Sequence, residues 1–147
     1  MPVLKTFFHQ DLNILLELMR DYYAHDGLEF NAAKAAQAVK DMLETSGGRV
    51  WLILEADIVI GYVVLIWSYS LEYGGLAAEL DELYLRSEAR GHGVGRAVMQ
   101  QVLEICREAG VVLLRLETEP GNEAARGFYG SLGFEIVKRE FMQLVNV

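Results

Sequence analysis

The sequence contains a single cysteine, Cys106, and only two prolines among its 147 residues. One cysteine can form neither an intramolecular disulfide nor a zinc site built from several cysteines, so both are excluded. We expect Cys106 to be a small buried apolar residue. Because 52% of the residues are hydrophobic and 23% are charged, a disordered or low-complexity chain is excluded as well.

Basic residues are also few, with 13 Lys and Arg against 21 Asp and Glu and a net charge of −8. Proteins that bind nucleic acid usually carry a basic face, so we expect no nucleic-acid partner. The longest run without a charged residue, Ile58 to Leu71, is shorter than the roughly 20 residues of a membrane-spanning helix. Because His9, Gln10 and Asp11 interrupt the first apolar residues, the start does not resemble a secretory signal. We therefore expect a cytoplasmic protein with no membrane partner.

The chain length suits a single domain, residues 1–147, with one hydrophobic core. The hydrophobic pattern contains no repeat and no linker, and it predicts strands mixed with helices. This order indicates an α/β fold with a mixed sheet. The expected elements are a strand at 3–8, helices at 11–25 and 32–44, a hairpin at 50–56 and 58–69, a strand at 78–86, a helix at 94–109, a strand at 111–118, a helix from 122 to about 133, and one long or two short strands at 134–145.

A glycine-rich segment, Arg90-Gly91-His92-Gly93-Val94-Gly95-Arg96, lies between a predicted strand and a predicted helix. The N-terminus of a helix offers unpaired N–H groups and a partial positive charge, and glycine lets an anion approach them closely. The segment therefore predicts a phosphate or pyrophosphate site. The segment is not a P-loop, because the Gly-Lys-Ser/Thr of that motif is absent. It also departs from the dinucleotide fingerprint G-x-G-x-x-G, because the third glycine comes one residue early. A plain loop in which the glycines only close a turn is the alternative.

A second segment, Asn122 to Phe134, reads Asn-Glu-Ala-Ala-Arg-Gly-Phe-Tyr-Gly-Ser-Leu-Gly-Phe. Asn122 is suited to capping a helix, and Phe128 and Tyr129 fall at helical spacing. By itself this pattern is compatible with a short amphipathic helix that buries aromatic residues and has no chemical role.

Together the two segments resemble the GNAT superfamily of CoA-dependent N-acetyltransferases. Arg90, Gly93 and Gly95 match the family's CoA-binding loop Gln/Arg-x-x-Gly-x-Gly/Ala. The second segment matches every fixed position of Asn-x-x-Ala-x-x-Phe-Tyr-x-x-x-Gly-Phe, and the strand Asp81 to Leu85 is similar to the strand that precedes the loop. The resemblance implies a central, mostly antiparallel mixed sheet flanked by about four helices.

The resemblance also implies that acetyl-CoA is the co-substrate. Arg90 and the N–H groups of 91–96 would hold its pyrophosphate, the backbone of Leu83 and Leu85 would pair with the pantetheine arm, and Asn122 would bond to that arm. The implied CoA-binding residues are Leu83, Tyr84, Leu85, Arg90, Gly91, His92, Gly93, Val94, Gly95, Arg96, Asn122, Phe128 and Tyr129. Because the middle positions of the loop vary in the family, we expect the side chain of His92 to face solvent rather than act as a base.

Acetyl transfer to an amine needs a base, because an amine with a pKa near 10.4 is almost fully protonated at pH 7. Glu79 and Asp81 are two residues apart on a predicted strand and share one face, whereas Glu82 should point to the other. We take Asp81 as the first candidate for the base and Glu79 as the second. The alternatives are that these acids only line an exposed strand end and that water removes the proton. The resemblance makes Tyr129 the acid that donates to the departing thiolate, with direct attack in a ternary complex.

The resemblance places the acceptor between the first two helices and the loop that joins the third and fourth strands. The residues it indicates are Tyr22, Tyr23, Asp26, Glu29, Phe30, Glu72 and Tyr73. Acidic and aromatic side chains suit a cationic amine, which can be a small molecule or part of a peptide. No histidine has partner acids at ligand spacing, so we expect no metal. Two other interpretations stay open: a non-catalytic acyl-CoA-binding sensor or interaction module on the same fold, and a structural subunit that forms a homodimer through its sheet.

Overall fold

A computed structural model describes all 147 residues of the chain. It contains five strands, four α-helices and two short 3-10 helices, η1 and η2. The elements follow in the order β1 (Val3–Thr6), η1 (His9–Asp11), α1 (Leu12–His25), α2 (Ala32–Glu44), β2 (Gly48–Glu55), β3 (Ile58–Ser70), β4 (Gly75–Leu85), η2 (Ser87–Ala89), α3 (Val94–Glu108), β5 (Leu113–Arg115) and α4 (Glu123–Ser131).

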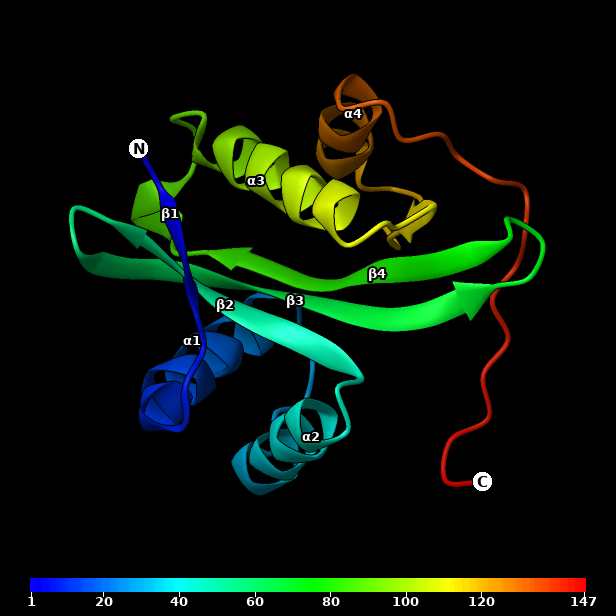
Figure 1. The fold of residues 1–147 in the computed structure, drawn as a ribbon. Helices are drawn as coiled ribbons and strands as arrows, with labels where there is room; N and C mark the ends of the chain where they lie inside the picture. The colour runs from blue at the N-terminus through cyan, green and yellow to red at the C-terminus, as the bar shows by residue number, and fades with distance from the viewer. The chain divides into compact units, whose positions relative to one another are not determined.

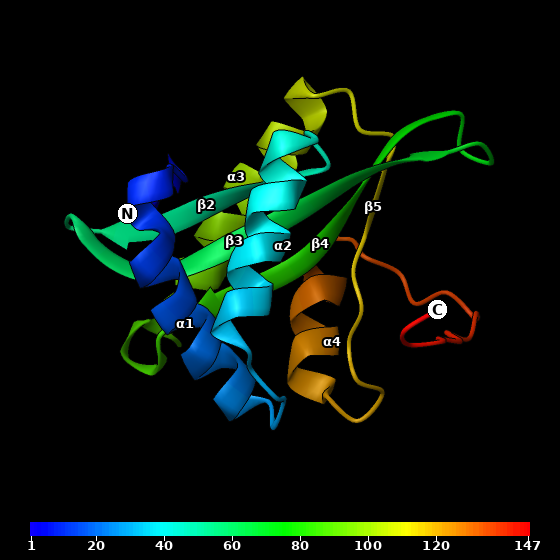
Figure 2. The same ribbon diagram turned by 90° about the horizontal axis from the view of Figure 1, so that it is seen from below.

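The five strands form one sheet in the order β1-β2-β3-β4-β5. The first four are antiparallel to their neighbours, and β5 runs parallel to β4. The α3 helix covers one face of this sheet, and α1 and α2 lie side by side on the other (Figure 1 and Figure 2). A mixed α/β fold with a mostly antiparallel sheet is therefore confirmed.

The core forms on both faces of β3, as its continuous apolar sequence predicts. Residues 60–65 of this strand are all buried. Leu15 and Leu18 of α1 are fully buried and belong to the same hydrophobic cluster as Tyr62 of β3. On α3, Val98 and Val102 are fully buried, and the prediction that Cys106 is a buried apolar residue is confirmed. Burial raises the pKa of the Cys106 thiol, which keeps it protonated and weakly nucleophilic.

The pairing of β3 with β4 contains a β-bulge at Asp81. Val64 lies opposite Glu82, but the next residue of β3, Leu65, lies opposite Leu80. Asp81 is therefore an extra residue in β4, and a bulge places two successive side chains on the same side of the strand. The expectation that Glu82 would point away from Asp81 is wrong, because regular alternation stops at this residue.

The chain divides into two compact units, Met1–Leu116 and Glu117–Val147. In the second unit, the side chain of Asn122 caps α4 by accepting the N–H of Ala125, and Gly133 follows the helix with a φ of 98°. The single domain at 1–147 stays a prediction. None of the helices combines the length and the apolar character that crossing a bilayer requires.

The strands expected at 134–145 are absent. No residue after α4 is in a strand, and Ile136, Val137, Phe141 and Met142 are all exposed. The only backbone bond within this segment is local, from Arg139 N–H to the Val137 carbonyl. An apolar sequence forms a strand only where another strand offers its edge, and β5, which was expected to span 111–118, is only three residues long.

Candidate active site

The glycine loop joins β4 to α3 through two glycines in the left-handed region. Gly91 has a φ of 81°, and Gly93, which precedes the first residue of α3, has a φ of 76°. A Cβ added to either would meet no atom within 4 Å. The positive φ is therefore the reason that these positions need glycine, because there is space for a side chain at both. The surface above both residues is open.

The N-terminus of α3 has no side-chain cap. The first bond of the helix runs from Ala97 N–H to the Gly93 carbonyl, at 3.1 Å. Gly93 offers no acceptor to the N–H groups of Val94 and Gly95, and no acidic residue lies in the first turn. Donors that face an open surface at the positive end of a helix dipole suit an anion such as phosphate.

Arg90 fixes the end of β4 to the start of the loop. Its Nε donates to the Leu85 carbonyl at 2.8 Å, and its guanidinium lies 5.4 Å from the centre of the Tyr84 ring. One Nη nitrogen is 3.5 Å from Nε2 of His25, at the end of α1. Arg90 therefore adds positive charge beside the loop and also orients it. His92 is exposed, in line with the expectation for its side chain.

Beyond the bulge, the outer edge of β4 has no neighbouring strand. The β5 strand pairs with β4 only through Ala77, Ala78 and Glu79. Since Arg86 N–H donates to the Ile60 carbonyl of β3, the alternation of an antiparallel pair directs the polar groups of Leu83 and Leu85 to the open edge. The Leu85 carbonyl there accepts from Arg90. Leu83 is thus the residue whose backbone is best placed to pair with an extended ligand.

On the face of the sheet that α1 and α2 cover, the Glu82 carboxylate accepts two tyrosine hydroxyls. Tyr23 of α1 donates to one carboxylate oxygen at 2.5 Å, and Tyr62 of β3 donates to the other at 2.6 Å. The sequence alone pointed to neither Glu82 nor Tyr62 as a site residue. The adjacent acids Asp81 and Glu82 were the available signal, because regular alternation would send them to opposite faces of the strand, whereas a bulge lets both face the same side.

Burial determines the protonation of this cluster. It is the largest factor that raises the pKa of Glu82, the negative charge of Asp81 adds to it, and the hydrogen bonds from Tyr23 and Tyr62 partly offset it. Burial also raises the pKa of both tyrosines, so their hydroxyls stay protonated and keep donating. Partial desolvation at the mouth of the cavity raises the pKa of Asp81 as well, which makes this carboxylate a stronger base than an ordinary one.

Asp81 and Glu82 line a cavity of about 370 Å³ between α1, α2 and the sheet. Asp81 is exposed and Glu82 is half-buried, so Asp81 lies at the opening of the cavity. Glu79 is not among the residues that line it. The apolar part of the wall includes Leu15, Met19, Val39, Met42, Val64 and Ile66.

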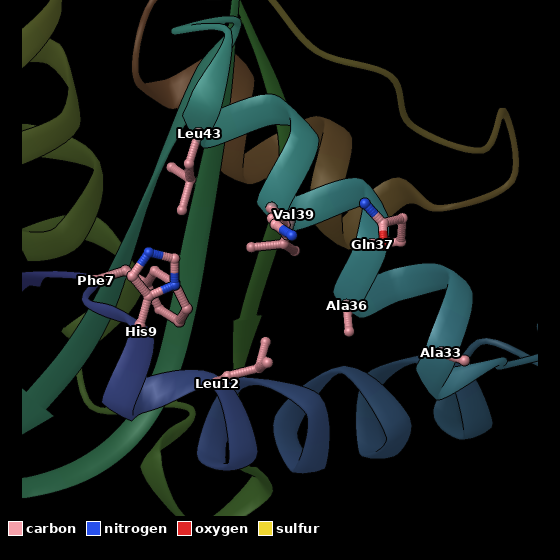
Figure 3. A pocket seen from close by; sticks show the side chains of 9 residues that line it. Phe7, His9, Leu12, Ala33, Ala36, Gln37, Val39 and Leu43 are labelled. Carbon is pink, nitrogen blue, oxygen red and sulfur yellow. The ribbon is translucent and has the colours of Figure 1, made fainter.

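A second hollow of about 200 Å³ lies elsewhere between α1 and α2 (Figure 3). Its lining residues include Phe7, His9, Leu12, Ala33, Gln37 and Leu43. It shares Val39 with the first cavity, but no carboxylate lines it. Without an acid that could bind or deprotonate an amine, this hollow is the poorer candidate for the acceptor site.

No three His, Cys, Asp or Glu side chains anywhere in the structure lie close enough together to hold a metal ion.

The structure brings three of the predicted acceptor residues, Tyr22, Tyr23 and Phe30, together beside the Glu82 carboxylate and its two tyrosine partners. The Tyr23 ring lies 5.6 Å from Tyr22 and 5.3 Å from Phe30, and Tyr22 also packs against Tyr62. Asp26, just after α1, is paired with His25 at 3.2 Å.

Glu72 and Tyr73 do not join this group. They lie in the turn between β3 and β4, and Glu82 follows Gly75, the first residue of β4, by seven positions. At about 3.4 Å per residue this separation is on the order of 20 Å. Glu72 and Tyr73 are therefore too far from Glu82 to line the cavity.

The second unit holds the other predicted residues. The Tyr129 ring packs 5.1 Å from Phe128 and 5.7 Å from Phe134, measured between ring centres. Burial raises the pKa of Tyr129, so its hydroxyl is protonated at neutral pH and available as a donor. Asn122 acts as the cap of the helix that carries Tyr129.

The sequence matches the Acetyltransferase (GNAT) family over residues 12–134, which is most of the chain. The chain belongs to this family. The resemblance drawn from the glycine loop and from Asn122 to Phe134 is thereby confirmed.

Curated GNAT relatives and a solved structure resemble the chain over different lengths. The thialysine N-epsilon-acetyltransferase of Bos taurus is 33% identical over 79 residues, which are 54% of this chain and 46% of that protein. The L-methionine sulfoximine/L-methionine sulfone acetyltransferase of Pseudomonas aeruginosa is 37% identical over 96 residues, or 63% of this chain and 56% of that protein. The chain thus spans about half the length of these relatives. An integron cassette protein from the mobile metagenome of Cole Harbour Salt Marsh has a TM-score of 0.85 and 34% identity, covering 98% of this chain and 90% of its own.

The half-buried Glu82 of this GNAT protein is expected to make its stability depend on pH. Because the pKa of Glu82 is raised in the folded state, its contribution to stability is fully present below the unfolded pKa and is lost as the pH rises through the folded pKa. The variant Glu82→Gln cannot ionise. We expect the free energy of unfolding of Glu82→Gln to increase relative to wild type as the pH rises above about 4, measured by urea unfolding. A difference that stays constant with pH would show that the carboxylate ionises as freely as in the unfolded chain.

Proposed function

We propose that the protein is an N-acetyltransferase that moves an acetyl group from acetyl-CoA to a primary amine by direct attack in a ternary complex. The observation that carries the proposal is that β4 and the loop after it hold three features of the site together: a pair of acids, an unpaired strand edge and a helix N-terminus. The β4 strand leads from two carboxylates in a cavity, along an unpaired edge, to an uncapped helix N-terminus built for an anion. Such a strand serves both substrates of an acetyl transfer.

The residues of the loop fit the CoA part of the co-substrate. The N–H groups at the start of α3 and the guanidinium of Arg90 would hold the pyrophosphate, because the surface above Gly91 and Gly93 is open. Leu83 would pair with the amide groups of the pantetheine arm, as an added strand does. Bound acetyl-CoA would supply the acetyl group as an activated thioester.

Asp81 is the proposed base. It lines the cavity near its opening, and its raised pKa suits proton transfer from an ammonium group. Glu82 is held in place by Tyr23 and Tyr62, and in its ionised form it would attract the ammonium group. Glu79 is the weaker candidate, because it does not line the cavity.

Tyr129 is the proposed acid. Its protonated hydroxyl can donate to the sulfur as negative charge develops there, because an unperturbed thiol has a pKa of only about 8.5. The role comes from the family resemblance, and the raised pKa keeps the hydroxyl in its protonated form, which can donate a hydrogen bond to the sulfur. A protein that only senses acyl-CoA needs neither this hydroxyl nor the carboxylate pair, which favours the enzyme over the sensor.

Binding and turnover of acetyl-CoA test the proposal. Calorimetry with the purified protein should give micromolar or tighter binding of CoA, and an amine panel should release free thiol from acetyl-CoA. Gly93→Val should abolish binding, because a side chain there covers the N–H groups of α3.

Valine is also strained at the positive φ of Gly93, at a cost of about 1–2 kcal/mol, so a matched control is needed. Gly110 follows α3 with a φ of 78° and equally open surroundings. Gly110→Val carries the same strain and should keep CoA binding. Equal loss in both variants, or wild-type protein that binds no CoA, would refute the assignment of the loop.

A further inference from the structure

We propose that the acceptor is a monoamine with an apolar body, whose ammonium group lies at Asp81 and Glu82 and whose apolar part fills the cavity between α1 and α2. This proposal rests on the proposed function, and it narrows the class of amine that the site accepts. The cavity and its two carboxylates lie within one compact unit of the chain.

The charge of the cavity excludes a negatively charged group on the acceptor. Asp81 and Glu82 are the only Asp, Glu, Lys or Arg residues among those that line it. A free amino acid would bring its α-carboxylate next to two acids with no cation to pair with it, and an unpaired buried charge is costly. Amino acids such as thialysine and methionine sulfoximine, the substrates named for two relatives, are therefore poor candidates for this chain.

The remaining wall is apolar, which limits the rest of the molecule. Leu15, Val39 and Val64 contribute branched side chains, and Met19 and Met42 contribute flexible thioethers that adapt to different shapes. A second ammonium group of a polyamine, or the hydroxyls of an aminoglycoside, would lose hydration here without gaining hydrogen bonds. A hydrocarbon or aromatic group gains from the same burial.

The size of the cavity and the rigidity of Glu82 agree with a small acceptor. About 370 Å³ is near the lower end of the range for small-molecule sites. Tyr23 and Tyr62 hold the two oxygens of Glu82 from different elements, α1 and β3, so the carboxylate cannot turn away from the cavity. A fixed charge at one end and an apolar wall at the other favour a molecule with one cationic end.

The first arm of the test compares three amines of different chemistry. Thiol release from acetyl-CoA would be measured with 2-phenylethylamine, the polyamine spermidine and the amino acid lysine, alongside calorimetry of 2-phenylethylamine alone. We expect kcat/KM for 2-phenylethylamine to exceed the other two by about tenfold or more. Turnover that favours spermidine or lysine would overturn the inference and leave the proposed function intact. Binding of 2-phenylethylamine without turnover of any amine would support the cavity assignment and refute the proposed function, and neither binding nor turnover would refute both.

The second arm fills the cavity. Ala35 of α2 is half-buried and lines it, so the larger side chain of Ala35→Leu would occupy part of the space. We expect the ratio of KM for 2-phenylethylamine to KM for ethylamine to rise by about tenfold or more, because only the larger amine needs the filled space. Ala33→Leu is the control, because Ala33 is exposed on the same helix and lines only the other hollow. An unchanged ratio in Ala35→Leu, or an equal rise in Ala33→Leu, would show that the apolar part of the acceptor lies elsewhere.

Discussion

Replacement of Tyr129 by phenylalanine is expected to lower kcat by about 100-fold or more, the usual contribution of one acid–base partner. Both kcat and kcat/KM should fall together, because the hydrogen bond to the departing sulfur strengthens only in the transition state. The ring of Tyr129 contacts Phe128 and Phe134, and phenylalanine preserves both contacts. The measurement is the steady-state release of free thiol under conditions in which chemistry limits the rate.

The same variant separates catalysis from packing. If Tyr129 only fills space, removal of its hydroxyl should change stability by no more than about 1 kcal/mol and leave turnover normal. The controls are calorimetric CoA affinity and urea unfolding of Tyr129→Phe, both of which should match wild type. Unchanged kcat would assign Tyr129 to packing, and another group would then have to protonate the thiolate.

Asp81→Asn is expected to lower kcat/KM at pH 7 by about 100-fold or more, because the amide keeps the shape of the carboxyl group but cannot accept a proton. In wild type, kcat/KM should rise with pH through an apparent pKa below that of the free amine, since Asp81 takes the proton after the ammonium group is bound. In Asp81→Asn the rise should move toward the pKa of the free amine, near 10.4 for an alkylamine. The measurement is a pH profile of thiol release.

Glu79→Gln is the matched comparison for this prediction. Glu79 lies on the same strand but does not line the cavity, so its amide variant should keep the wild-type pH profile. A displaced profile in Glu79→Gln together with a normal one in Asp81→Asn would reverse the assignment of the base. If both variants keep the wild-type profile, the proton leaves through water.

Features that depend on neighbouring residues were predictable from the sequence. The α2 helix begins and ends as expected, because Asn31 caps it and the Ser-Gly-Gly segment after Thr45 stops it. The hairpin between β2 and β3 turns at Ala56 and Asp57, whose φ values of 50° and 62° suit a tight two-residue turn. The glycine loop was recognisable for the same reason, since its chemistry comes from a few successive backbone groups.

Features that depend on register were decided only by the tertiary structure. The adjacent acids at 81 and 82 mark an irregular point in the sequence of β4, but only the pairing of β4 with β3 decides that the bulge lies there. The bulge brings Glu82 to the cavity, where Tyr23 and Tyr62 meet it from positions 59 and 20 residues away in the chain. Likewise, the apolar residues at 134–145 could form strands only if an edge were available, and β5 is too short to provide it. The sequence by itself determined the turns, the caps and the glycine loop before α3, because these involve contacts within a few residues. The acid cluster and the extent of the sheet required the fold, because pairing between distant strands sets which side chains share a face.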